Sequence, residues 1–217
     1  MGIERDQRQG KIDRAVVLLY AAVALCATLL HEPWLDEAQH WCLARDSATL
    51  ADLWRNTSIE GHPPLWHWLL WCVTRCTHEM VAMRLLHVGV AIAAVALLVL
   101  RSSLPPVVRW LVPFGYFFAY EYSAIARNYA PGVLLLFAVC ALNTDRRWYL
   151  RTLLLSALAL THLWGTVAAV AYCLTRTDLA NWRARLIGIS RALLVLPAVA
   201  LALWRIMPHG SSPYGIR

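Results

Sequence analysis

Two short polar stretches interrupt an otherwise apolar chain, and they carry the residue types that acid–base chemistry requires. The first, WLDEAQHW, contains the adjacent carboxylates Asp36 and Glu37. A carboxylate held beside tryptophan side chains can accept the proton of a hydroxyl group as a general base. The alternative is that both acids only mark the first turn of a helix, where negative charge is favourable. We take Asp36 and Glu37 as the candidate catalytic residues.

The second stretch, EGHPPLWHW, combines Glu60 and His62 with two consecutive prolines. The prolines fix a rigid bend in the backbone, so Glu60 and His62 are expected at the start of the helix that follows. A helix that begins at a proline and carries an incidental histidine explains the same pattern. Glu60 and His62 therefore rank as candidate binding residues.

A divalent metal ion is a second kind of chemistry that these stretches allow. Asp36 and His40 are four residues apart and would share one face of a helix. Their oxygen and nitrogen donors suit a divalent ion, and His31, His62 and His67 belong to the same segment. Asp36 and His40 are the candidate metal ligands, and a divalent ion is the one cofactor that the sequence indicates. No CxxC or HExxH pattern predicts a closed zinc site.

The remainder of the chain has the composition of a membrane protein. Of its 217 residues, 59% are hydrophobic and 15% are charged, and the mean hydropathy is +0.51. A soluble domain is about 45–50% apolar and about 25% charged. The composition therefore excludes a water-soluble globule and a disordered chain, and no basic stripe indicates a nucleic-acid partner. We predict an all-α polytopic membrane protein.

The apolar runs predict about seven transmembrane helices, because about 20 apolar residues cross a bilayer and flanking residues shorten that requirement. The segment 148–174 is interpreted as two short helices hinged at residues 161–165, with one long tilted helix as the alternative. The other five runs are 15–30, 80–100, 107–120, 129–142 and 190–205.

The net charge of +7 is interpreted as a sign of topology rather than of an anionic partner. Basic residues gather at 5–14, 101–109, 146–151 and 176–191, between the apolar runs. The positive-inside rule places these groups in the cytoplasm. It follows that the N-terminus is cytoplasmic and that both the segment 31–79 and the C-terminus lie outside.

The outer segment 31–79 holds six of the 11 tryptophans and five of the eight histidines. Tryptophan at this density is typical of the lipid headgroup layer. Short helices are predicted from Trp34, over 48–55 with Ser47 as N-cap, and over 64–76. The first would lie in the interface with an apolar underside that includes Trp34 and Trp41.

The order of these features resembles the membrane glycosyltransferases of the GT-C fold, in particular the superfamily of protein O-mannosyltransferases and aminoarabinose transferases. Members of that superfamily carry an Asp-Glu pair in the first outer loop, matched by Asp36 and Glu37. They carry a PPL element before the second span, matched by Pro63, Pro64 and Leu65. Some have a lysine where this chain has His62.

Two further elements extend the resemblance toward the end of the chain. The family often has an Arg-x-Tyr at the outer start of the fourth span, matched by Arg127 and Tyr129 in ARNYAPGVLLLF. The THLWG stretch, with His162 and Gly165, is similar to the short hairpin that follows. Family members are considerably longer, so residues 1–217 are interpreted as a single, incomplete GT-C-like transmembrane domain.

The resemblance implies transfer of a sugar from a polyprenyl-phosphate donor to a lipid, glycan or protein acceptor. The reaction would take place at the outer face of a bacterial inner membrane. Asp36 would be the base, and Glu37 would orient the substrate or share a metal ion. The donor phosphate and substrate would be bound by the remaining polar residues of the motifs: Glu60, His62, Arg127, Tyr129 and His162. Arg127 alternatively extends to the phosphates of the lipid bilayer.

Two other functions stay open. A metal or small-solute transporter would use the outer segment as a capture vestibule, but it should carry ionisable residues in the middle of its spans. Arg84, His87 and His162 are all predicted toward the outer ends, which favours chemistry at the surface. A truncated homologue without catalysis, acting as an assembly partner, is the other alternative.

Overall fold

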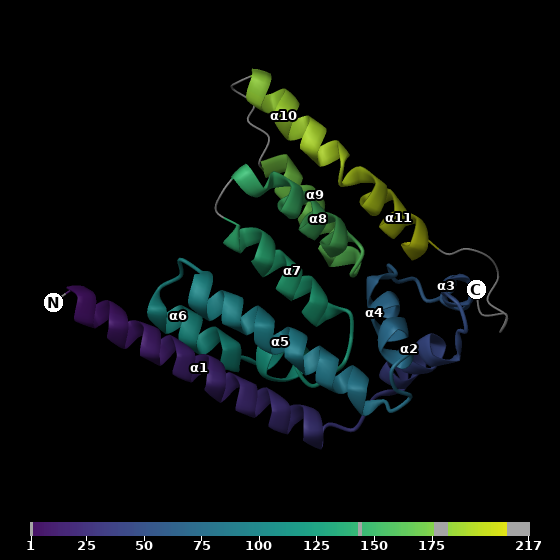
Figure 1. The fold of residues 1–217 in the computed structure, drawn as a ribbon, viewed down its shortest axis with the longest axis horizontal. Coiled ribbons are helices and arrows are strands. Elements are labelled where there is room, and N and C mark those ends of the chain that lie inside the picture. Colours follow the sequence, from purple (N-terminus) through teal and green to yellow (C-terminus); the bar gives the residue numbers. More distant parts are fainter. Residues whose placement is uncertain (1, 143–144, 176–181, 208–217) are drawn as a thin grey trace. The chain divides into compact units, whose positions relative to one another are not determined.

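The computed structural model describes residues 2–142, 145–175 and 182–207, and every regular element within them is helical (Figure 1). This confirms the predicted all-α class. The described chain divides into two compact units, each built from two separate stretches of sequence. Unit 1 comprises the chain up to Ala38 and Glu79–Ala141, and unit 2 comprises Gln39–His78 and the described residues from Leu142 onwards.

Unit 1 is built around three packed helices, with α5 in contact with both α1 and α7 (Figure 1). Its elements are α1 (Gly2–Leu30), the first turn of α2 (Leu35–Asp46), α5 (Val81–Arg101), α6 (Pro106–Leu111), the 3-10 turn η1 (Val112–Phe114), the π-helical turn η2 (Phe117–Glu121) and α7 (Tyr129–Ala141).

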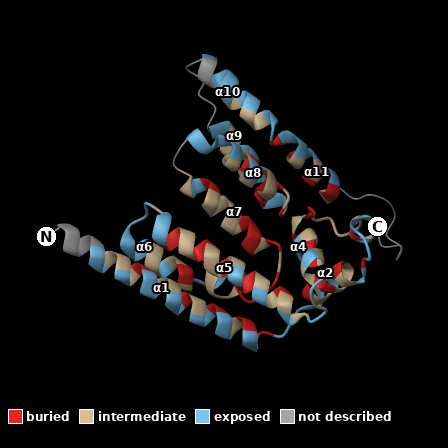
Figure 2. Cartoon of the chain, viewed as in Figure 1, coloured by how far each residue is buried: buried red, intermediate tan, exposed pale blue. Residues whose placement is uncertain are grey.

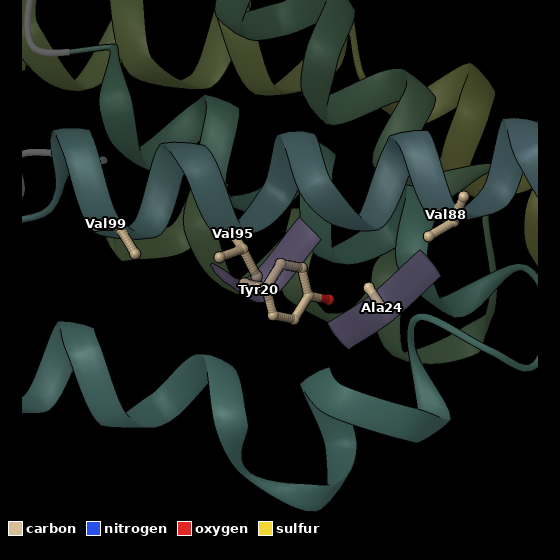
Figure 3. Packing of buried hydrophobic residues seen from close by; sticks show 5 residues of the cluster. All are labelled: Tyr20, Ala24, Val88, Val95 and Val99. Atoms are coloured by element: carbon tan, nitrogen blue, oxygen red, sulfur yellow. The ribbon is translucent and has the colours of Figure 1, made fainter. Parts of the chain in front are cut away.

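The core of unit 1 lies between α1 and α5. Three buried valines of α5 point toward Tyr20 and Ala24 of α1 (Figure 3). The hydroxyl of Tyr20 donates a 2.8 Å hydrogen bond to the carbonyl of Phe118. This satisfies a polar group inside the core and attaches the segment around η2 to α1.

Two helices of the described chain are long and apolar enough to cross a membrane, namely Gln7–Leu30 within α1 and Val81–Arg101, which is α5. Much of α1 is exposed (Figure 2). Its exposed large apolar side chains include Leu18 and Leu30, at 71% and 85%. A soluble protein rarely leaves such a surface uncovered, so α1 has the outer face that lipid contact requires. Predicted spans at 15–30 and 80–100 correspond to these helices.

The other predicted spans do not form long, straight helices among the described residues. Helices α7, α8 (Trp148–Ala159) and α9 (Leu163–Thr175) are apolar but only 12 or 13 residues long. Residues Arg185–Leu193 and Leu196–Ile206 would make a third span only if the pair, bent by 44°, is counted as one. The structure therefore supports two to three spans, and the number seven stays a prediction.

The segment 107–120, predicted as one span, is not a continuous helix. It divides into α6, η1 and η2. Pro113 lacks the N–H that would continue the hydrogen-bonding pattern of a helix, and Gly115 has extended backbone angles (φ −71°, ψ 157°). By contrast, the break predicted within 148–174 is confirmed, because α8 ends at Ala159 and α9 begins at Leu163.

Unit 2 packs α8, α9 and α11 against one another, and α3 against α4. The backbone N–H of Leu65 donates to the carbonyl of Leu160 at 3.0 Å, which attaches the start of α4 to the corner between α8 and α9. Its elements are the rest of α2, α3 (Leu50–Asn56), α4 (Leu65–Thr74), the 3-10 turn η3 (Asp145–Arg147), α8, α9, α10 (Trp182–Leu193) and α11 (Leu196–Ile206).

Two predictions for the outer segment need correction. The N-cap of α3 is Thr49, whose side chain forms a reciprocal capping box with Asp52, while Ser47 donates instead to the carbonyl of Leu43. Trp34 is half-exposed, but Trp41 is only 2% exposed. Protein covers Trp41, so the two tryptophans do not form one underside that faces lipid.

Candidate functional site

The first candidate site, in unit 1, is an ion pair between Asp36 and Arg127. Asp36 lies in the first turn of α2, and Arg127 lies in the short segment that precedes α7. Both side chains remain partly open to solvent, with 35% of the Asp36 side chain and 23% of the Arg127 side chain exposed. Two residues from separate sequence motifs thus meet where solvent can reach them.

Glu37, the neighbour of Asp36, is completely buried, and its carboxylate oxygens accept hydrogen bonds from other groups of the protein. Its Oε2 accepts hydrogen bonds from the backbone N–H of Trp34 and from Nε2 of His31, both at 2.8 Å. The bond to Trp34 is the carboxylate half of a capping box, because Glu37 is the third residue of α2. Its Oε1 accepts from the backbone N–H of Ala126 at 2.6 Å. Glu37 therefore fixes the backbone next to Arg127.

Three more contacts hold the end of α1 close to this ion pair within unit 1. Arg84 of α5 donates to the carbonyls of Thr28 and His31, two groups that have no helical partner where α1 ends. Nδ1 of His31 lies 3.4 Å from the hydroxyl of Tyr120. The two ring nitrogens of His31 thus contact Glu37 and Tyr120 on opposite sides of the ring.

Arg127 is also oriented by an aromatic ring. Its guanidinium carbon lies 5.7 Å from the ring centroid of Tyr129, within the range of a cation–π interaction. This contact gives the Arg-x-Tyr spacing a physical meaning: the tyrosine at the start of α7 supports the arginine that faces Asp36.

A pocket of about 360 Å³ opens at the end of α1 in unit 1. Its walls are mostly apolar or aromatic, with the imidazole of His31 and the carboxylate of Glu32 as polar groups. The lining residues are Ala27, Leu30, His31, Glu32, Trp34 and Tyr120.

The second candidate site, in unit 2, gathers His40 of α2, His67 of α4 and Glu60 from the loop before α4. Their nearest donor atoms all lie within 4.8 Å of one another, and Nε2 of His40 is 3.7 Å from Oε2 of Glu60. The His40 ring also contacts the rings of His67 and His62, with centroids 4.8 and 5.9 Å away. The groups that meet here, three histidines and one carboxylate, include a donor set for a metal ion.

Burial changes the acid–base properties of this cluster. Burial raises the pKa of the Glu60 carboxyl, and the 2.6 Å hydrogen bond from Gln39 to its Oε1 opposes the shift. Burial also lowers the pKa of His67 to about 3, and the nearby His40, His62 and Arg205 act in the same direction. His67 is therefore a neutral imidazole at physiological pH.

His162, predicted as a substrate residue, lies in unit 2 at the corner between α8 and α9. Its Nδ1 is 2.8 Å from the hydroxyl of Thr161, which itself donates to the carbonyl of Leu158. Gly165 belongs to the same corner, because a Cβ on it would lie 2.4 Å from both the Leu158 carbonyl oxygen and Thr161 Oγ1. The glycine is thus required by close packing of the chain.

The predicted residues therefore form two groups, one in each unit. Glu60 and His62 lie with His40 in unit 2. Asp36, Glu37, Arg127 and Tyr129 assemble in unit 1. The proposed metal pair is divided, because Asp36 binds Arg127 whereas His40 faces Glu60 and His67. Sequence reasoning missed two groups: Gln39, which orients Glu60, and the backbone N–H of Ala126. Gln39 could have been considered, because it is adjacent to the candidate ligand His40.

No model of a known protein family, no curated protein and no solved structure matches this chain.

Proposed function

We propose that this chain is a GT-C-type glycosyltransferase that moves a sugar from a polyprenyl-phosphate donor to a hydroxyl acceptor. The observation that carries the proposal is the ion pair between Asp36 and Arg127. A transferase of this kind needs a base for the acceptor and a cation for the departing phosphate. The two residues named for those tasks by the sequence motifs meet in unit 1, and both are accessible to solvent.

In the proposed reaction, the acceptor oxygen attacks the anomeric carbon of the sugar. The new carbon–oxygen bond forms as the bond from that carbon to the phosphate oxygen breaks, and polyprenyl phosphate leaves with the electron pair. Asp36 takes the hydroxyl proton as attack proceeds. Glu37 is the less suitable base, since its two oxygens already accept three hydrogen bonds inside the protein.

Arg127 couples the two ends of this reaction. In the resting protein its guanidinium is paired with the Asp36 carboxylate. When Asp36 becomes protonated, it loses the charge that held the guanidinium. At that moment the departing phosphate gains negative charge, and charge-assisted hydrogen bonds from arginine to phosphate are strong. The same arginine therefore orients the base first and stabilises the leaving group afterwards.

The pocket beside His31 is suited to the donor. Ala27 and Leu30 offer an apolar surface at the end of α1, and Trp34 and Tyr120 add aromatic walls. Such a surface fits the first isoprene units of a lipid carrier, whose phosphate then lies at the membrane surface. His31 and Arg84 support the pocket through the hydrogen bonds that fix the end of α1.

The membrane arrangement forms part of the proposal. The chain would cross a bacterial cell membrane about seven times in a GT-C-like arrangement, with the N-terminus in the cytoplasm and 31–79 outside. The short apolar helices α7, α8 and α9 would then be spans shortened by polar flanks. The basic residues between the apolar runs support this orientation through the positive-inside rule.

Chemistry at the surface is favoured over transport by the positions of two ionisable groups on α5. Arg84 and His87 lie in its first two turns, and both bind backbone carbonyls of unit 1. A transport path needs ionisable groups in the middle of a span. These two groups instead stabilise the end of α1 and the segment that carries Arg127.

The direct test is an assay of the purified chain in nanodiscs with a panel of polyprenyl-phosphate sugars. Release of polyprenyl phosphate would be followed by mass spectrometry, with and without lipid, glycan and peptide acceptors. We expect release with at least one donor, and release that depends on an acceptor. If no donor in the panel is consumed by folded protein with any acceptor, the proposed function is wrong.

A further inference from the structure

We propose that His40, Glu60 and His67 form a binding site for Zn²⁺ in unit 2. The site shares no residue with the Asp36–Arg127 pair, so the proposal is independent of the proposed sugar transfer. Two imidazoles and one carboxylate are a common ligand set for zinc, and three protein ligands leave a fourth position open.

The distances between the donor atoms are close to those that zinc requires. A tetrahedral ion with bonds of about 2.0–2.1 Å has ligand atoms about 3.3 Å apart. His40 Nε2 and Glu60 Oε2 are 3.7 Å apart, and no pair in the group exceeds 4.8 Å. Small rotations of the side chains would bring all three donors onto one ion.

His67 provides an independent reason to expect a ligand. The residue is only 2% exposed, and neither of its ring nitrogens has a hydrogen-bond partner within the described residues. A buried imidazole left in this state carries an uncompensated desolvation cost. Coordination to a metal ion through one nitrogen removes part of that cost. The ring already contacts His40, the other histidine of the proposed site.

The surroundings of Glu60 resemble those of a metal-binding carboxylate. Gln39 donates to Glu60 Oε1 at 2.6 Å, while Oε2 faces His40. Such outer hydrogen bonds orient the ligands of metal sites. The ring of His62 also packs against the His40 ring, with centroids 5.9 Å apart.

Arg205 acts electrostatically on His67, as His40 and His62 do, but its guanidinium is bound by other groups of unit 2. It donates to the carbonyls of Trp54 and Thr57, and its guanidinium lies over the Trp54 ring, 4.3 Å from the centroid. A bound ion would fasten the loop that carries Glu60 to α2 and α4.

The test uses the full chain, purified in detergent without a polyhistidine tag and stripped of metal with a chelator. Zn²⁺ would be titrated by calorimetry and counted by elemental analysis, and Co²⁺ would serve as a spectroscopic probe. We expect one tightly bound ion with a Kd below about 1 µM, together with the strong visible absorption of tetrahedral Co²⁺. Zinc at 100 times its Kd should raise the melting temperature by about 5–10 °C.

The matched variants are His67→Gln, Glu60→Gln and, as the control, His78→Gln, which changes an exposed histidine outside the group. Loss of one ligand should weaken zinc binding at least about 100-fold, more than the 10–100-fold typical of outer contacts. Gln39→Leu should fall within that smaller range. Should His67→Gln fail to fold, Glu60→Gln in the loop carries the test. Stripped wild-type protein that binds no zinc below about 10 µM, or equal losses in His78→Gln and Glu60→Gln, would overturn the proposal.

Discussion

The backbone N–H of Ala126 donates a 2.6 Å hydrogen bond to Oε1 of the buried Glu37. These two residues are the sequence neighbours of Arg127 and Asp36, which form the accessible ion pair. The buried Glu37–Ala126 contact and the exposed Asp36–Arg127 contact therefore join the first turn of α2 to the segment before α7. Glu37 is in this account a positioning residue, whose task is to hold Arg127 opposite Asp36.

Glu37→Gln should destabilise the folded protein. The glutamine side chain has one acceptor oxygen for three donors, and its amide group would face one of them. Leaving a buried donor without a partner costs about 1–3 kcal/mol. The measurement is the free energy of unfolding in detergent. Glu32→Gln, which changes an exposed acid in the same segment, should alter it by less than about 0.5 kcal/mol, and equal effects would contradict the assignment.

Arg127→Gln should lower the turnover number by about 10²–10³-fold, the range found when a donor to developing negative charge is removed. The variant also frees the Asp36 carboxylate, which can still accept the proton of the acceptor. The loss should therefore appear in kcat more than in the KM for the acceptor. Arg55→Gln is the control, because the Arg55 side chain is 75% exposed and pairs with Asp52, a residue of the α3 capping box. Unchanged turnover in Arg127→Gln would remove the arginine from the mechanism.

The sequence patterns named the residue types of the candidate site, but they did not show which residue has which role. Adjacent residues of a helix point about 100° apart, so Asp36 faces solvent and Arg127 while Glu37 enters the interior. The sequence pattern does not show which of these two side chains, Asp36 or Glu37, is buried. It also named Arg127 only as a phosphate ligand, since pairing across a fold depends on tertiary packing.

Some of the corrected features could have been predicted from the sequence, and others could not. Thr49 has Asp52 three residues later, as a capping box requires, whereas Ser47 has the apolar Leu50 at that position. Pro113 likewise marked the break within 107–120. The division into two units left no such trace, because each unit combines two stretches that are separated in the chain.

Gly165→Ala should destabilise the corner between α8 and α9. The added Cβ would lie 2.4 Å from the Leu158 carbonyl oxygen and from Thr161 Oγ1, so the backbone must shift. Overpacking of this kind costs about 1–3 kcal/mol. Gly89→Ala is the matched control, since its Cβ would meet nothing within 4 Å. Thermal unfolding of the two variants should separate them, and equal melting temperatures would mean that the corner is looser than described.

The proposed orientation predicts opposite labelling of two single cysteines. In a background without the six native cysteines, Ser58→Cys should react with an impermeant maleimide added to intact cells. Ser103→Cys, in the basic loop after α5, should react only after the membrane is opened. Labelling of both positions from the same side would exclude the proposed topology.

The central claim is that Asp36 accepts the proton of the acceptor hydroxyl, and Asp36→Asn tests it most directly. Asparagine keeps the size of the side chain and can still accept a hydrogen bond from Arg127, but it cannot take up the proton. Asp46→Asn is the control, because Asp46 lies at the other end of α2 with 61% of its side chain exposed. Turnover of a polyprenyl-phosphate sugar should fall about 10²–10⁴-fold in Asp36→Asn and stay near wild type in Asp46→Asn. Wild-type turnover by folded Asp36→Asn protein would contradict the account.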